Sequence, residues 1–342
     1  MCSGGDALDG PGKKRKSGIF LLRTLEGASV NIVIGGGAGF IGAPLARALS
    51  RMGHNVTAID DMSTGYRSSR DSPVPLVKGS LDDSKFVARV IERTLPSLYI
   101  HLASQPDVRL SWESPAWDIQ RTAGAIMGVL EASRLASIPW ILLVSSGEVL
   151  GNAGEKDRSP LSERTPMAPF SPYGISHAFA EFSLASLSDP HATRQTVVRL
   201  SPVYGPGQTV AGEGGLIGSA VRQTLLRSSV NPPAIPGNGG RVRDYVYIDD
   251  AVEALLHIIS RDAEGVFHVG SNVPVSDREI FLEIGKILGD DAPVNYHSKT
   301  FADSEYRVLG HGRLAQESDW ECEVSFHEGM ARTIKFFSEV IQ

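Results

Sequence analysis

Three glycines at a fixed spacing, Gly36-x-x-Gly39-x-x-Gly42, form the first group of residues that could do chemistry. They follow the apolar run 30–34 and precede a helical pattern. Such glycines permit a tight turn and let a pyrophosphate approach the backbone at the amino end of a helix. Asp60 ends the next apolar run, where its carboxylate would bind a ribose diol and repel a 2′-phosphate. The pattern predicts a site for NAD rather than NADP, the alternative being a plain strand-loop-helix turn.

A second group combines a phenol with hydroxyl and carboxylate side chains. The segment Ser145-Ser146-Gly147-Glu148 closes the apolar run 140–145, and Tyr173 follows Pro172, a favoured first residue of a helix. Ligands of parallel sheets bind at the carboxyl ends of the strands, so Ser146 and Tyr173 can face one cleft. A phenol beside a bound nicotinamide can take the proton of a substrate hydroxyl while hydride leaves the carbon. Taken alone, however, a tyrosine near a helix start is more often a packing residue.

The elements that must position these residues alternate along the chain. The expected strands are 30–34, 55–60, 76–77, 97–102, 140–145 and 196–200, and the expected helices are 40–52, 85–93, 117–136 and 171–187. This alternation predicts an α/β fold, a doubly wound parallel sheet of the Rossmann type, with a smaller C-terminal substrate-binding lobe. We expect a flexible tail over 1–28 and an NAD-binding domain over 29–200, to which some later segments return. The remainder, 201–342, is expected to be mainly the substrate-binding lobe and to close with a helix over 326–341.

Further motifs follow the glycine loop in a fixed order. They are Asp60-Asp61-Met62-Ser63-Thr64-Gly65, His101-Leu102-Ala103-Ser104-Gln105, Ser145-Ser146-Gly147-Glu148-Val149, Ser171-Pro172-Tyr173-Gly174, Arg199, Val203-Tyr204-Gly205-Pro206-Gly207, and the run from Gly239 to Asp250. Together they resemble the extended short-chain dehydrogenase/reductase family, in its sugar-nucleotide epimerase/dehydratase branch. The resemblance covers roughly 30–260, with a looser match to the end.

The resemblance implies a chemistry. Enzymes of this family hold NAD tightly and oxidise the C4 hydroxyl of a sugar. The 4-keto sugar then epimerises, eliminates water or decarboxylates, and hydride returns. By position, Tyr173 resembles the catalytic base, Ser146 the hydroxyl that positions O4, and Arg243 the arginine that grips the substrate diphosphate, a role suited to a guanidinium fork. Arg243 could instead pair with Asp249 or Asp250.

The same resemblance implies the other residues of the site. The expected cofactor contacts are Gly36, Gly39, Phe40, Ile41, Gly42, Asp60, Asp61, Leu81, Leu102, Ala103, Tyr173 and His177. The expected catalytic residues are Tyr173, Ser146, Glu148 and His177, and the expected substrate contacts are Ser146, Gln105 and Arg243. No metal is expected, because His101, His191 and His268 have no cysteine or carboxylate at ligand spacing.

One catalytic position departs from the family pattern Tyr-x-x-x-Lys, because the fourth residue after Tyr173 is His177. A fixed cation about 4 Å from a phenol is worth roughly 4 kcal/mol at an effective dielectric near 20, which lowers a phenol pKa by about 3. A histidine is mostly neutral at pH 7, and an ordinary phenol is only about 0.1% ionised there. We therefore expect an activity that climbs toward alkaline pH, unless bound cofactor phosphates keep His177 charged.

Other positions also depart from the family pattern. Thr122 and Pro202 stand where asparagines are usual, and Ser80 replaces an aspartate that contacts adenine. Glu148 is typical of dehydratases and uronate decarboxylases rather than epimerases, and a carboxylate beside C5 could act as a base. Dehydratases pair it with a preceding aspartate, whereas Gly147 has no proton to give. The other interpretation of Glu148 is a residue that supports its neighbours by hydrogen bonds.

The amino-acid composition limits the kinds of partner that the protein is expected to bind. The chain has 342 residues, 42% hydrophobic and 21% charged, and its formal net charge of -6 argues against a broad nucleic-acid interface. No apolar run is long enough for a membrane span or a secretory signal, so we expect no membrane partner. Two cysteines, Cys2 and Cys322, favour a reducing, cytoplasmic setting. The basic run 13–16 is a targeting or nucleic-acid signal or, more simply, part of a solvated tail.

The sequence leaves three functions open. The first is an NAD-dependent nucleotide-sugar enzyme, with C4 epimerisation ahead of decarboxylation or 4,6-dehydration. The second is a cofactor-binding protein with little turnover, suggested by His177, Thr122 and Pro202. The third is a reductase of a non-sugar carbonyl, against which Arg243 argues because it suits a diphosphate. The resembled family also makes a homodimer an expectation.

Overall fold

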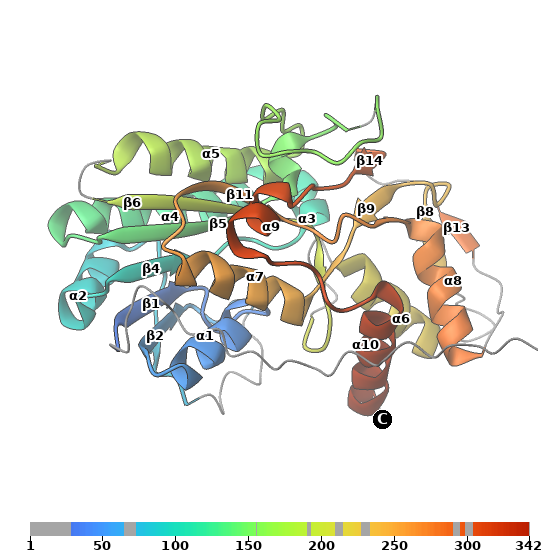
Figure 1. Cartoon of the computed structure of the whole chain (residues 1–342), viewed down its shortest axis with the longest axis horizontal. Helices are drawn as coiled ribbons and strands as arrows, with labels where there is room; N and C mark the ends of the chain where they lie inside the picture. The colour runs from blue at the N-terminus through green and yellow to red at the C-terminus, as the bar shows by residue number, and fades with distance from the viewer. Residues whose placement is uncertain are drawn as a thin grey trace, which may run out of the picture.

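A seven-stranded sheet organises the molecule (Figure 1). The computed structural model describes residues 29–64, 73–154, 156–189, 193–208, 215–226, 233–289, 295–297 and 304–341. The strand order is β11-β6-β5-β4-β1-β2-β3, and every neighbouring pair is parallel. The strands are β1 (Asn31–Gly35), β2 (Asn55–Asp60), β3 (Leu76–Lys78), β4 (Leu98–His101), β5 (Trp140–Ser146), β6 (Arg194–Leu200) and β11 (Gly265–Val269).

Helices cover both faces of this sheet because its strands are apolar on both sides. In β1, Ile32 and Ile34 pack into one core with α1 and α7, whereas Val33 packs into another with α2, α4 and α5. Successive side chains of a strand point to opposite faces, so one apolar run supplies both cores. The helices are α1 (Gly42–Arg51), α2 (Ser84–Thr94), α3 (Val108–Glu113), α4 (Pro115–Leu135), α5 (Pro172–Leu187) and α7 (Ile248–Ser260).

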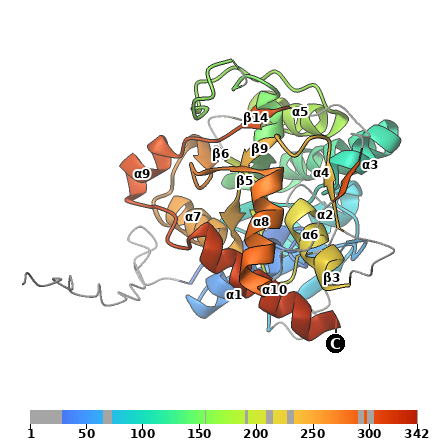
Figure 2. The same cartoon turned by 90° about the vertical axis from the view of Figure 1, so that its right-hand side faces the viewer.

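The later part of the chain adds small sheets and helices beside the main sheet (Figures 1 and 2). The short strands are β7 (Val203–Tyr204), β8 (Ala234–Pro236), β9 (Val242–Asp244), β10 (Val246–Tyr247), β12 (Pro274–Ser276), β13 (Asn295–His297) and β14 (Tyr306–Arg307). The helices are α6 (Gly215–Leu225), α8 (Asp277–Leu288), α9 (Gly312–Ser318) and α10 (Phe326–Ile341). Ile284 and Phe337 of these helices belong to the same apolar core as Ile32, so that core continues from the sheet into the later elements.

The predicted doubly wound parallel sheet is confirmed. Six of its strands lie where the apolar runs placed them, within one or two residues. The seventh, β11, comes from beyond Leu200 and pairs with β6. Helix α1 begins at Gly42 rather than at Phe40, because 36–41 form the turn that leaves β1. Helix α3 was not predicted from the sequence, and the expected tail over 1–28 lies outside the described residues.

Candidate functional site

The glycine loop brings backbone close to backbone at the carboxyl end of β1. Gly36 has φ +78°, and a Cβ there would lie 2.8 Å from the amide nitrogen of Ala103. A Cβ on Gly42 would lie 2.1 Å from the carbonyl oxygen of Gly36, so only glycine fits where α1 meets the loop. Ile41 precedes α1 and has no polar atom to cap it. The loop therefore leaves a cradle of the kind that a pyrophosphate requires.

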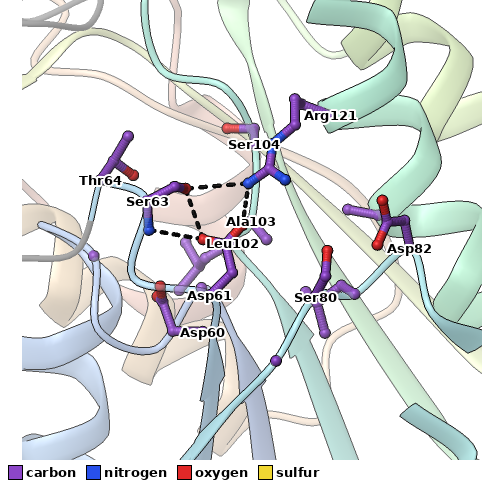
Figure 3. Close-up of a pocket in the computed structure, with 15 residues that line it drawn as sticks. Asp60, Asp61, Ser63, Thr64, Ser80, Asp82, Leu102, Ala103, Ser104 and Arg121 are labelled. Carbon is purple, nitrogen blue, oxygen red and sulfur yellow. Dashed lines mark hydrogen bonds and ion pairs between the residues drawn. The ribbon is translucent and has the colours of Figure 1, made fainter. Parts of the chain in front are cut away.

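An open pocket with about 610 Å³ of empty space lies beside this loop (Figure 3). It is bounded by the ends of β1, β2 and β4, by the segment after β3, and by α4. Seven of the expected cofactor contacts line it, namely Gly36, Gly39, Asp60, Asp61, Leu81, Leu102 and Ala103. Phe40 and Ile41 instead pack, half-buried, against the adjoining core.

Asp60 lies at the floor of the pocket, where β2 ends. Its Oδ2 accepts from the amide of Ala38 at 3.0 Å, and its Oδ1 accepts from the amide of Met62 at 2.8 Å. Burial raises the pKa of Asp60, and the two backbone hydrogen bonds oppose that rise. The carboxylate is thus held between the glycine loop and the segment after β2, where it lines the pocket (Figure 3).

Arg121 is among the pocket residues that the sequence did not predict as contacts. It projects from α4, contacts Asp61 through an ion pair, and donates to the hydroxyl of Ser63 at 3.1 Å. Its only sequence signal was a charge on a helix otherwise rich in small residues, next to Thr122. Contact with a loop 60 residues away cannot be read from such a pattern.

Tyr173 lies in the first turn of α5, whose start is fixed by two hydrogen bonds and a proline. Ser171 caps the helix by accepting from the amide of Gly174 at 3.0 Å, and Pro172 occupies the first position. The amide of Tyr173 donates to the hydroxyl of Ser111, on α3, at 3.2 Å. The unpredicted helix α3 therefore helps to orient the candidate base.

Ser146 lies at the end of β5, and its hydroxyl accepts from the amide of Glu148 at 3.1 Å to start the short helix η2 (Gly147–Leu150). The start of α5 packs closely on η2, since a Cβ on Gly174 would lie 2.7 Å from the carbonyl oxygen of Glu148. The fold thus brings the segments of Tyr173 and Ser146 together. Both side chains are buried, and neither lines the pocket described above.

His177 lies one turn beyond Tyr173, with 4.5 Å between the two ring centroids. The imidazole is buried, and burial together with the neighbouring His101 lowers its pKa to about 3. His177 is therefore neutral at pH 7. Its Nε2 has no hydrogen-bond partner among the described residues. His101 ends β4 directly before Leu102, so this histidine pair joins the Tyr173 region to the pocket.

Glu148 points into a buried contact with Arg307, from β14, and both side chains are 3% exposed. Its other carboxylate oxygen accepts from the hydroxyl of Ser171 at 3.3 Å. Burial lowers the pKa of Arg307 to about 9, so the guanidinium remains charged at pH 7. Arg307 was also missed, because nothing in the sequence links it to a residue 159 positions earlier.

Two of the three expected substrate contacts, Arg243 and Gln105, form side-chain hydrogen bonds with backbone groups. Arg243 is buried and donates to the carbonyl oxygens of Val242, at 2.8 Å, and Ser304, at 2.9 Å. The side chain of Gln105 bonds the backbone of Asp107, and the backbone amide of Gln105 donates to the hydroxyl of Thr122 at 3.1 Å.

The acids considered as alternative partners of Arg243 have their own contacts. Asp249 contacts Arg332 at 3.5 Å, and Asp250 accepts from the amides of Glu323 and Val324.

In the part of the chain that the structure describes, no three His, Cys, Asp or Glu side chains gather as a metal site. Likewise, no described helix is long and apolar enough to cross a bilayer. His191, one of the histidines considered above, lies outside the described residues.

Comparison with known proteins assigns the fold and this loop to a family. The model of the "NAD dependent epimerase/dehydratase family" matches residues 32–270. The chain belongs to this epimerase/dehydratase family. The match includes most of β1, the glycine loop, Asp60, the Tyr173 segment and β11. NAD is the cofactor of the family, and the cradle and pocket described above fit it.

Individual members of the epimerase/dehydratase family align along nearly their whole length. The UDP-glucose 4-epimerase of Mycolicibacterium smegmatis is 29% identical over 311 residues, covering 89% of this chain and 97% of that one. A dTDP-glucose 4,6-dehydratase of Xanthomonas campestris is 25% identical over 333 residues, covering 89% and 92%. The chain is thus similar to enzymes of two reaction types.

Solved structures of the family superpose on the same architecture. The UDP-glucose 4-epimerase of Thermotoga maritima with UDP-glucose has a TM-score of 0.83 and 28% identity, covering 91% of this chain and 100% of that one. The enzyme of the same name from Thermus thermophilus, complexed with NAD, has a TM-score of 0.83 and 28% identity, covering 90% and 98%. These matches confirm the predicted fold class and the predicted family.

Proposed function

We propose that this chain uses NAD to oxidise and then reduce the sugar of a nucleotide sugar at C4, and that its reaction is C4 epimerisation. The observation that carries the proposal is the packing of the Tyr173 turn on η2, next to Ser146. This packing lies one strand away from the NAD pocket. The similarity to UDP-glucose 4-epimerases over most of the chain supports the choice of reaction.

Each residue of the site then has a role. NAD, when bound, supplies the acceptor and donor of hydride. Tyr173 takes the proton of the sugar O4 hydroxyl and later returns it, while the Ser146 hydroxyl holds O4 in place. His177 binds the nicotinamide ribose as a neutral hydrogen-bonding group. Arg243 and Gln105 bind the substrate, with the guanidinium of Arg243 suited to the diphosphate.

Glu148 favours a second candidate reaction, decarboxylation or 4,6-dehydration of the 4-keto sugar. A buried carboxylate next to Ser146 is the feature expected of those reactions, and relatives include dTDP-glucose 4,6-dehydratases. Against dehydration, Gly147 has no acid to protonate a leaving hydroxyl. The contacts of Glu148 with Arg307 and Ser171 support a positioning role instead, in which Glu148 ties η2 to β14.

A test of the function is direct. Purified protein is incubated with UDP-glucose, UDP-galactose, UDP-glucuronic acid and dTDP-glucose, and the products are identified by NMR. We expect interconversion of the gluco and galacto sugars, reduced at least about 100-fold by Tyr173→Phe. Tyr296→Phe, at a half-exposed tyrosine on β13, is the matched control and should keep full activity.

Two other outcomes decide between the remaining functions. If no product forms while NAD stays bound, the chain is a cofactor-binding protein rather than a nucleotide-sugar enzyme. Calorimetry with UDP separates a nucleotide-sugar enzyme from a reductase of other carbonyls, because the latter has no use for the diphosphate.

The remaining assignments are part of the same proposal. Residues 29–200, together with α7 and β11, form the NAD-binding part, and the rest of 201–342 forms the substrate-binding lobe. The scarcity of cysteines supports a cytoplasmic protein. We also propose that two copies associate as a homodimer, for which an exposed apolar face of α5 is the supporting observation.

A further inference from the structure

The charges around the NAD pocket are unevenly distributed. Among the described residues that line it, three carry carboxylates and one carries a guanidinium, namely Asp60, Asp61, Asp82 and Arg121. Figure 3 shows Arg121 reaching from α4 toward the loop that follows β2. A guanidinium beside the ribose end of a dinucleotide site is the chemistry that recognises a 2′-phosphate.

The guanidinium of Arg121 is engaged by the loop across the pocket. It contacts Asp61 Oδ2 through an ion pair and donates to Ser63 Oγ at 3.1 Å. The same hydroxyl donates to Asp61 Oδ1 at 2.6 Å, and the amide of Ser63 donates to that oxygen at 2.9 Å. Asp61, Ser63 and Arg121 thus form a closed triad at the pocket wall.

Asp61 is ionised at neutral pH. Partial burial pushes the pKa of its carboxyl up, but the hydrogen bonds from Arg121 and Ser63 outweigh burial and leave the pKa below its ordinary value. The side chains of Arg121 and Asp61 are 32% and 25% exposed, so the pair is screened by solvent yet open to a ligand in the pocket.

We propose that Asp61 sets the preference of this pocket for NAD over NADP by occupying Arg121, the cation that would otherwise accept a 2′-phosphate. Asp61 acts twice, because it neutralises the guanidinium and adds a negative charge next to Asp60. The inference deepens the proposed function and requires only that NAD binds in this pocket.

The competing account is that the pair merely fastens α4 to the loop after β2. Exposed ion pairs commonly contribute less than about 1 kcal/mol to stability. A pair that only holds α4 against this loop would therefore leave the choice of cofactor unchanged. The two accounts differ in the ratio of bound NADP to bound NAD, which can be read without any turnover.

The test equilibrates purified full-length protein with an equimolar excess of NAD and NADP and measures the bound nucleotides by mass spectrometry. In Asp61→Asn we expect the NADP:NAD ratio to rise about tenfold to a hundredfold, the usual range for one charge-assisted hydrogen bond. Asp61→Ser removes the same carboxylate with a different side chain and should act in the same direction.

The double variant Asp61→Asn with Arg121→Met decides the role of the guanidinium. In this double variant the NADP:NAD ratio should lose the increase seen in Asp61→Asn and return to within about threefold of the ratio in the unmodified protein. Glu317→Gln removes a carboxylate from the surface pair with Arg313, on α9, and should leave the ratio unchanged.

Any of three results would overturn the proposal: an unchanged ratio in both Asp61 variants, a gain that survives in the double variant, or an equal gain in Glu317→Gln. The readout also separates this proposal from the proposed function, because a protein that binds NAD but converts no sugar still reports the ratio.

Discussion

At the scale of single residues, Tyr173, the proposed base, lies beside the neutral ring of His177. Burial lowers the pKa of His177 to about 3, so no charge stands 4.5 Å from the phenol ring at neutral pH. A lysine in that place would favour the phenolate by roughly 4 kcal/mol at an effective dielectric near 20. The base of the proposed reaction must therefore work without a cationic neighbour at this position.

This arrangement predicts a steep pH dependence. Between pH 7 and 9 the ionised fraction of an ordinary phenol rises about tenfold per pH unit, and kcat should follow it. His177→Lys should flatten the profile and raise kcat at pH 7 by about tenfold or more. His327→Lys, at an exposed histidine of α10, should keep the original profile. A flat profile in the unmodified protein would show that another group replaces the missing lysine.

At the scale of elements, the position of α1 depends on the glycine loop. A Cβ on Gly42 would meet the carbonyl oxygen of Gly36 at 2.1 Å, so Gly42→Ala must push α1 away from the loop. We expect a loss of about 1–3 kcal/mol in the free energy of unfolding and a clear drop in co-purified NAD. Gly312→Ala, where a Cβ would meet nothing within 4 Å, is the control. If Gly42→Ala and Gly312→Ala have equal stability and equal NAD content, the glycine loop does not serve as the pyrophosphate cradle.

Helix α5 carries a second prediction at this scale. Ile175, Phe179 and Phe182 follow one another at helical spacing and are 47%, 46% and 59% exposed. If this face joins two copies, sedimentation velocity should show a dimer for the unmodified protein and a monomer for Phe179→Glu with Phe182→Glu. Leu282→Glu, at an exposed leucine on α8, should remain a dimer. A monomer in every case would remove the dimer proposal.

Local sequence patterns predicted the elements that follow from an apolar run or a fixed residue spacing, and they missed the elements that lack such a pattern. The strand 31–35 and the glycine loop follow from an apolar run and a fixed spacing, both of which are local. Helix α3 has six residues and no apolar periodicity, so it could not be predicted, although Ser111 orients Tyr173. Arg121 and Arg307 reach the site across 60 and 159 positions, and such contacts exist only in the folded chain.

At the scale of the whole molecule, Asp244 connects segments from three parts of the chain. Its Oδ1 accepts from the hydroxyl of Ser201 at 2.7 Å and from the amide of Leu309 at 3.1 Å. Burial raises the pKa of Asp244 from its ordinary 3.8 to about 7. Between these values the folded protein keeps a proton that the unfolded chain has released.

Stability should respond to pH accordingly. This one group lowers the free energy of unfolding as pH rises from about 4 to 7, by at most about 1.4 kcal/mol per pH unit. Asp244→Asn has no such proton, so its stability relative to the unmodified protein should improve over that range. Denaturation curves at pH 5, 6 and 7 measure this. If the difference in the free energy of unfolding between Asp244→Asn and the unmodified protein stays constant over this pH range, Asp244 does not hold a proton in the folded state.

The central claim is that hydride leaves C4 of a nucleotide sugar and returns to the same carbon with inverted configuration. Incubating the protein with UDP-glucose carrying deuterium at C4, and examining the product by NMR, tests it most directly. The account predicts UDP-galactose that retains the deuterium at C4. Deuterium found at C6 would show dehydration instead, and deuterium lost to solvent, or no product with NAD bound, would contradict the account.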